Sequence, residues 1–190
     1  MSKKITSLFN FKKLQKFSSA LMLPIAILPA AGLILAIGIS FNIELLANCG
    51  GLIFANLPLL FCVGIVIGLT GDGSSSLSAI ISYMIMNATM GTQLGITAES
   101  VAASNGDYAM ILGVPTLQTG VFGGLIVAIF VYLLYTRFHN IELPQFLGFF
   151  GGKRFVPIIT AVAAIIVGYL LPWLWIPVQK GLARTIDTAI

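Results

Sequence analysis

Charged residues divide this chain into long apolar stretches. Marking every Lys, Arg, Asp and Glu leaves five uncharged gaps, at 17–43, 45–71, 73–98, 108–136 and 155–179. A bilayer core of about 30 Å needs roughly 20 residues of α-helix, and every gap is longer than that. The pattern therefore predicts an all-α membrane protein with about five transmembrane helices, near 18–39, 51–70, 76–97, 114–136 and 156–178.

The third stretch is the most polar of the five. Its apolar residues are diluted by nine polar ones: Ser74, Ser75, Ser76, Ser78, Ser82, Asn87, Thr89, Thr92 and Gln93. Two interpretations follow, a true span that lines a wet cavity or a re-entrant segment that enters and leaves on one side. Both require protein or water to cover the backbone.

The distribution of basic residues favours five complete spans. Residues 1–16 form a basic arm with Lys3, Lys4, Lys12, Lys13 and Lys16. If this arm is cytoplasmic, five spans also place the loop that carries Arg137, Lys153 and Arg154 in the cytoplasm, which obeys the positive-inside rule. We therefore predict a cytoplasmic amino terminus and a helical cytoplasmic loop between the fourth and fifth spans.

Composition supports a membrane protein and excludes other classes. Apolar residues make up 58% of the 190 residues and charged residues only 8%, whereas soluble domains carry about 25% charged residues. The formal charge of +4 suggests no nucleic-acid partner, because half of the basic residues lie in the arm and none alternate with aromatic residues.

Residues that could carry chemistry are few. His139 has no Cys, Ser or carboxylate partner at a recognisable spacing, and no phosphate-binding loop is present. Cys49 and Cys62 do not match a zinc motif, and Cys62 is expected to be a buried free thiol. Asp72 comes nearest to an intramembrane carboxylate, on a Gly-Asp-Gly turn. We predict no catalytic residue, no metal site and no cofactor.

Small residues four apart occur at Gly64 and Gly68 and at Gly120 and Gly124. Such pairs let helix backbones approach closely. Packing within the chain is favoured over a dedicated dimer contact, because Gly is frequent in membrane helices.

Four stretches together resemble a known family. They are ALMLPIAILPAAGLILAIG (20–38), FANLPLLFCVGIVIGLTGDG (54–73), ILGVPTLQTGVFGGLIV (111–127) and RFHNIELPQFLGFFGGKRFVPI (137–158). They are similar to enzyme IIC, the membrane domain of the bacterial phosphoenolpyruvate-dependent sugar phosphotransferase system (PTS), in its glucose, N-acetylglucosamine and maltose branch.

The resemblance implies a sugar transporter in the bacterial plasma membrane. In this family a cytoplasmic domain, enzyme IIB, phosphorylates the sugar as it enters, and the activity is that of a protein-N(π)-phosphohistidine–sugar phosphotransferase. Phosphate reaches a cysteine of IIB through enzyme I, the histidine phosphocarrier protein and IIA. The family fold is all-helical with about ten spans, and the family is dimeric.

The sequence departs from the family pattern at its end. It stops at Ile190, shortly after the fifth predicted span. We therefore expect residues 1–190 to be an amino-terminal portion of the domain that is incomplete by itself. The family's histidine-pair segment, its Glu-Pro motif and the IIB cysteine are not found in it, so the substrate-binding residues stay unknown.

Lys153 and Arg154 match the basic pair of the family's Gly-Lys-Arg-Phe-Val-Pro stretch. One reading is that the pair docks an acidic or phosphorylated partner through charge-assisted contacts. The other is that it keeps the loop inside, next to anionic lipid, at about 1 kcal/mol per residue.

Three functions remain in view. The chain is part of a sugar permease, or a non-transporting dimerisation or scaffold module that associates with one, or a small channel. The channel is the least favoured, because few polar groups lie at membrane depth to line a pore.

Overall fold

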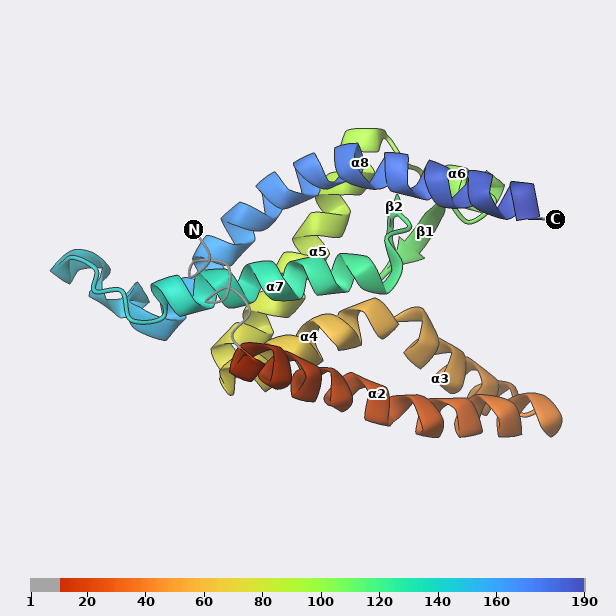
Figure 1. Ribbon diagram of the computed structural model, residues 1–190, viewed down its shortest axis with the longest axis horizontal. Helices are drawn as coiled ribbons and strands as arrows, with labels where there is room; N and C mark the ends of the chain where they lie inside the picture. The colour runs from red at the N-terminus through yellow and green to blue at the C-terminus, as the bar shows by residue number, and fades with distance from the viewer. Residues whose placement is uncertain (1–10, 190) are drawn as a thin grey trace.

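The structure is a computed structural model that describes residues 11–189, with side chains for 15–181. Its elements follow in chain order in Figure 1: α2 (Phe11–Ser40), α3 (Glu44–Ala55), α4 (Leu57–Thr70), α5 (Gly73–Leu94), α6 (Ala98–Ala103), β1 (Tyr108–Ile111), β2 (Val114–Leu117), α7 (Gly120–Phe138), the 3₁₀ helices η1 (Gln145–Phe150) and η2 (Gly152–Arg154), and α8 (Phe155–Ala189).

Helices α2, α7 and α8 extend along the long axis of the molecule, whereas α5 crosses this direction obliquely (Figure 1). Helices α3 and α4 fold back along α2, α7 lies in the middle, and α5 passes behind α7 in this view and packs against α8. The start of α2, the α4–α5 turn, the end of α7 and the start of α8 lie at one end, which we call the Asp72 end. The α2–α3 turn, α6 and the β1–β2 hairpin lie at the other, the hairpin end.

Three of the described helical segments are long and apolar enough to cross a membrane: Gln15–Ser40, Gly120–Phe138 and Gly152–Gly181. A fourth crossing is possible if α3 and α4, which meet at an angle of 57°, form one broken span. The predicted helical membrane architecture is thus confirmed, whereas α5 does not meet the same test of length and apolarity.

The break between α3 and α4 divides the predicted span 51–70. Pro58 is the second residue of α4, where a backbone N–H has no partner within the helix, so its absence does not weaken α4. In one continuous helix, Pro58 would remove a backbone hydrogen bond. The Asn56 side chain donates to the carbonyl of Leu52 at 2.9 Å. A proline next to a residue that caps the preceding helix therefore explains the bend.

Close approaches join α2, α4 and α7. A Cβ added at Gly64 would lie 2.8 Å from Cδ of Pro24, and one at Gly68 would lie 2.6 Å from Cβ of Ala20. A Cβ at Gly124 would collide with the carbonyl oxygen of Pro58. The prediction that these glycines pack helices within the chain is confirmed for Gly64, Gly68 and Gly124. Gly120 begins α7 at a φ of 55°, and a Cβ added there would meet no atom of a neighbouring helix within 4 Å.

The polar residues of α5 are turned into the protein. Ser75, Ser78 and Ser82 are fully buried, and the hydroxyl of Ser78 donates to the carbonyl of Ser74 at 2.8 Å. Gly168 of α8 lies against the backbone of Met86 in α5. Because these serines are covered by protein and not by lipid, α5 can be the least apolar of the long helices and still lie among them.

A β-hairpin follows α6 and takes up the start of the predicted span 114–136. Tyr108 pairs with Leu117 and Ile111 with Val114. The two turn residues between them, Leu112 and Gly113, have φ values of 51° and 80°, as type I′ hairpins require. Helix α7 consequently begins only at Gly120.

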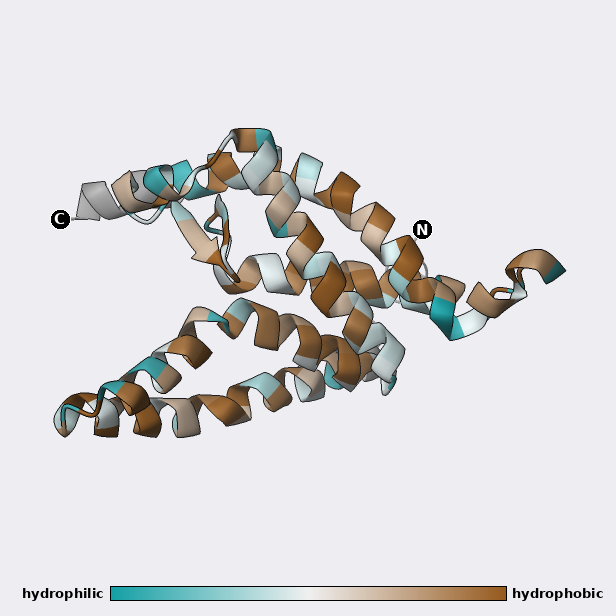
Figure 2. Ribbon diagram, turned by 180° about the vertical axis from the view of Figure 1, so that it is seen from behind, coloured by the Kyte–Doolittle hydropathy of each residue, from teal (hydrophilic) through white to brown (hydrophobic). Residues whose placement is uncertain are grey.

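The buried core and the outer surface are both apolar. The core lies mainly between α4, α5 and α7. Large side chains are exposed on the outside, including Met22 and Leu33 of α2 and Trp173 of α8, which are 69%, 65% and 74% exposed. Figure 2 shows hydrophobic residues along most of the length of α2. Exposed apolar surface of this extent is typical of helices that face lipid or other membrane helices.

Candidate functional site

The α4–α5 turn places one carboxylate at the end of the helix bundle. Gly71 ends α4 in the left-handed conformation, at a φ of 69°, which only glycine adopts without strain. Asp72 then caps α5, because its side chain accepts a 3.3 Å hydrogen bond from the N–H of Ser74. The left-handed turn at Gly71 and the capping hydrogen bond from Ser74 together orient the Asp72 carboxylate.

Two residues distant in sequence converge on this carboxylate. The hydroxyl of Tyr135, in the last turns of α7, donates to Oδ2 of Asp72 at 2.9 Å. Nζ of Lys153, in η2, lies 3.2 Å from the same oxygen. The Asp72 side chain is 16% exposed and that of Lys153 is 61% exposed. We call Asp72, Tyr135 and Lys153 the Asp72 cluster.

The environment keeps Asp72 ionised. Desolvation by itself would raise the pKa of Asp72, but hydrogen bonds from Tyr135, from the N–H of Ser74 and from Lys153 outweigh it and lower the pKa below its usual value of 3.8. At neutral pH the cluster therefore holds an ionised carboxylate that accepts a hydrogen bond from the phenol of Tyr135.

Hydroxyl groups surround the base of the turn. The Ser75 hydroxyl donates to the carbonyl of Asp72 at 2.6 Å, and the oxygens of Thr70 and Ser75 lie 2.5 Å apart. These contacts satisfy the backbone where α4 ends and α5 begins. The cluster is therefore a rigid joint between helices, with no nucleophile paired to a base.

The structure separates the two residues of the predicted basic pair. Lys153 turns inward to Asp72, whereas Arg154 turns toward η1, where its guanidinium carbon lies 4.8 Å from the centre of the Phe149 ring. Nη1 of Arg154 also donates to the carbonyl of Phe149 at 3.3 Å. Lys153 and Arg154 therefore have different partners, although their adjacency in the sequence suggested one shared role.

His139 and the cysteines lie outside any catalytic arrangement among the described residues. The ring of His139 stacks on Tyr135 at 5.0 Å, and its Nδ1 lies 2.9 Å from the Tyr135 carbonyl oxygen. Cys62 is a buried free thiol, as predicted, and Cys49 is exposed on α3. Among the described residues, no three His, Cys, Asp or Glu side chains gather at one point where they could hold a metal ion.

A second polar site lies at the hairpin end. The Gln179 amide donates to Oδ1 of Asp107 at 2.8 Å, and these two residues line a cavity of about 320 Å³ together with Tyr108 and Lys180. The contact ties α8 to the hairpin. This hydrogen bond between Gln179 and Asp107 has a structural role and supplies no reactive group to the cavity.

Sequence reasoning singled out Asp72 and Lys153 separately and missed that they meet. Tyr135 is 63 residues away from Asp72 in the sequence, so its role in this cluster could not be read from neighbouring residues. The available signal was weak: an acid between two glycines at the end of an apolar stretch, and basic residues in a loop predicted on the same side.

Comparison with known proteins points to one family. A sequence model described as "Phosphotransferase system, EIIC" matches residues 18–188. The chain is also 44% identical, over 192 aligned residues, to the "PTS system glucose-specific EIICBA component" of Staphylococcus saprophyticus. The match covers 90% of this chain but only 28% of that relative.

Proposed function

The chain belongs to the phosphotransferase system EIIC family, and from this membership we propose that it is part of the membrane component of a phosphoenolpyruvate-dependent sugar PTS. In this role it takes part in the uptake of glucose, or of a related sugar such as N-acetylglucosamine or maltose, and in the coupled phosphorylation. The observation that carries the proposal is the 44% identity to a glucose-specific relative.

We propose that residues 1–190 supply the membrane framework and not the chemistry. The Asp72 cluster joins helix ends through a hydrogen bond and an ion pair, and it holds no histidine or cysteine that could carry phosphate. Enzyme IIB, with IIA and the histidine phosphocarrier protein behind it, is proposed as the source of the phosphoryl group. The sugar-contacting residues are proposed to lie in sequence that follows this portion in family members.

Uptake measurements test this proposal. In a bacterial strain without its own glucose PTS permease, we expect no uptake of labelled glucose from this chain alone. We expect uptake when it is co-expressed with the part of the Staphylococcus saprophyticus relative that lies beyond the match. Uptake by the chain alone would show that it is sufficient, and membrane insertion without uptake in either case would favour the scaffold alternative.

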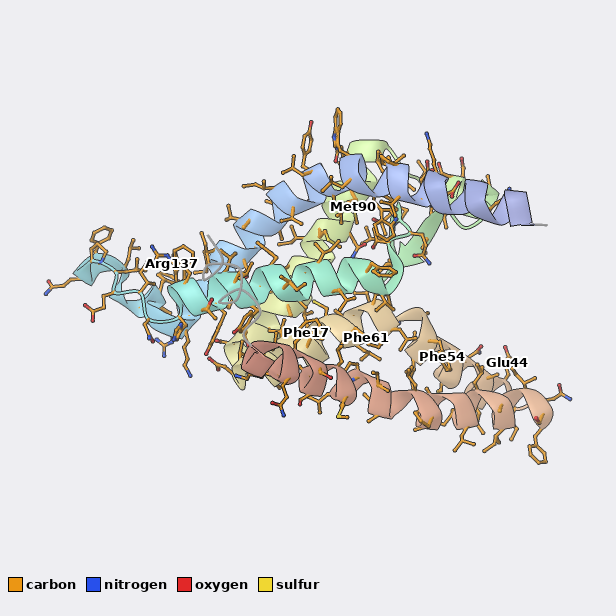
Figure 3. The ribbon with its side chains drawn as sticks, in the orientation of Figure 1. Phe17, Glu44, Phe54, Phe61, Met90 and Arg137 are labelled. Atoms are coloured by element: carbon orange, nitrogen blue, oxygen red, sulfur yellow. The ribbon has the colours of Figure 1, made fainter. Side chains whose placement is uncertain are left out.

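We further propose five spans with the amino terminus in the cytoplasm. Helix α5 is continuous over 22 residues and runs from the Asp72 end to the hairpin end (Figure 1), which supports a full crossing over a re-entrant segment. Arg137 lies at the Asp72 end and Glu44 at the opposite end (Figure 3). This separation agrees with the positive-inside rule if the Asp72 end is cytoplasmic.

Cysteine labelling tests the topology. In a background with Cys49→Ala and Cys62→Ala, we expect Asn140→Cys to resist a membrane-impermeant maleimide on intact cells. Asn105→Cys, near the hairpin, should react and serves as the control. Labelling at position 140 on intact cells would contradict the proposed orientation.

A homodimer is also proposed, because large apolar side chains of α2 and α3 have no partner within the described chain. Leu33 and Leu52 are each 65% exposed. Cross-linking of single cysteines at these positions in membranes tests it, with a cysteine at Met84 of α5, 47% exposed, as the comparison position.

A further inference from the structure

The 3₁₀ helix η1 presents apolar side chains to its surroundings. Phe146 is 82% exposed, Phe149 72%, Phe150 44% and Leu147 38%. We call these four residues the aromatic knob. Exposed side chains of this size and proximity are uncommon unless another surface covers them.

The position of these side chains favours contact with water over contact with lipid chains. The knob lies outside the apolar helices, between Arg137 and Glu142 on one side and Lys153 and Arg154 on the other. It extends beyond the ends of α7 and α8, in the direction in which α7 runs (Figure 1). In a membrane crossed by α7, this direction leads away from the hydrocarbon core and into water.

The knob has a defined shape. The N–H of Gly152 donates to the carbonyl of Ile141 at 2.9 Å and closes the loop at its base. The rings of Phe149 and Phe150 pack edge to face, with their centres 5.3 Å apart. The guanidinium carbon of Arg154 lies over the Phe149 ring, 4.8 Å from its centre. A preformed apolar surface loses little conformational entropy on binding.

The charge around the knob is positive. Arg137, Lys153 and Arg154 are near it in the chain, against the single acid Glu142. Lys153 is already paired with Asp72, so Arg154 is the cation placed directly on the knob. Aromatic residues and Arg are the residue types most enriched among the dominant contacts of protein interfaces.

We infer that the aromatic knob, together with Arg154, is a docking surface for a water-soluble protein domain whose contact face is acidic around an apolar hollow. This inference rests on the proposed function, within which the partner is the phosphorylated IIB domain. Its phosphocysteine adds negative charge, and docking at the Asp72 end would hold it at the cytoplasmic mouth of the permease.

Binding to the full chain in nanodiscs of phosphatidylcholine, a zwitterionic lipid without net charge, tests the inference, with purified IIB domain of a glucose-specific relative as the probe. We expect Phe146→Ala with Phe149→Ala to weaken binding at least tenfold. Phe41→Ala is the matched control, because Phe41 is 73% exposed in the α2–α3 turn at the opposite end. It should leave the affinity unchanged.

The outcomes separate the inference from the proposed function. Equal affinity of the double variant and the unmodified chain would overturn the docking surface and leave the coupling to IIB standing. Absence of any IIB binding to the unmodified chain would overturn both. Arg154→Gln should lower the affinity at low salt and reduce its salt dependence, and an unchanged salt dependence would contradict the role of Arg154.

A second measurement distinguishes protein docking from lipid contact. A nitroxide on Phe146→Cys, with Cys49 and Cys62 replaced by Ala, is expected to be accessible to a water-soluble nickel complex in vesicles with or without anionic phosphatidylglycerol. IIB should then protect it. Preferential access of oxygen over the nickel complex would place the knob in lipid and overturn the inference.

Discussion

The hydroxyl of Tyr135 donates a 2.9 Å hydrogen bond to Oδ2 of Asp72, and this contact ties the end of α7 to the turn between α4 and α5. Lys153 adds the loop before α8 through the same carboxylate oxygen. One carboxylate therefore fixes the relative positions of four helix ends. Lys153 belongs to the loop that carries the aromatic knob, so its ion pair with Asp72 also positions the proposed docking surface.

Tyr135→Phe should destabilise the chain. The change removes only the hydroxyl, and a hydrogen bond to a charged group contributes about 1.5 to 3 kcal/mol. We expect a lower midpoint of thermal unfolding in detergent. Tyr169→Phe is the control, because Tyr169 is 56% exposed on α8, and it should change stability by less than about 0.5 kcal/mol. Equal midpoints for the two variants would contradict the role of the Tyr135 hydroxyl.

The contribution of Asp72 should depend on pH. Its pKa is lower in the folded state than its usual value of 3.8, so the ionised form stabilises the fold above that pH. This stability is lost as the pH falls from 3.8 through the folded-state pKa. Asp72→Asn should therefore be less stable than the unmodified chain at pH 7, and the difference should shrink at pH 3. A difference that is constant between these pH values would contradict this prediction.

Gly68→Ala should weaken the contact between α2 and α4. Its new Cβ would lie 2.6 Å from Cβ of Ala20 and 2.7 Å from Cα of the same residue. Overpacking of this kind costs about 1 to 3 kcal/mol. Gly32→Ala, also within a helix but with nothing within 4 Å, should be neutral or slightly stabilising. Thermal unfolding of both variants checks the prediction, which fails if Gly68→Ala is as stable as Gly32→Ala.

Ser82→Leu should disrupt the packing of α5 inside the protein. Ser82 is fully buried, and a larger side chain there must displace the neighbouring helix at a cost of about 1 to 3 kcal/mol. Met84→Leu is the matched control, since Met84 is 47% exposed two residues later. If α5 faced lipid with its polar side, Ser82→Leu would instead be tolerated, and limited proteolysis in detergent would show no difference between the variants.

The apolar helices could be predicted from the sequence because a membrane imposes a simple rule on length and charge. The predicted spans 18–39 and 156–178 lie inside α2 and α8. The bend at Asn56 and the hairpin at 108–117 were not predicted. Both occur within uncharged stretches, where hydropathy alone cannot distinguish a straight helix from a broken helix or a short strand pair.

The site was less predictable than the fold. Lys153 and Arg154 were chosen as a pair because they are adjacent, and their different partners, Asp72 and Phe149, depend on how the loop folds. The exposure of Phe146 could not be read from a stretch of apolar letters, because the same letters describe a buried segment equally well.

The sequence by itself determined that the chain is a helical membrane protein of a recognisable sugar-transport family, because hydrocarbon excludes charge and the motif from 137 to 158 is distinctive. Only the tertiary structure decided which face of α5 is buried, which cation meets Asp72 and which phenylalanines stay uncovered. Those outcomes depend on contacts between residues far apart in the chain. Local composition carries no information about such contacts.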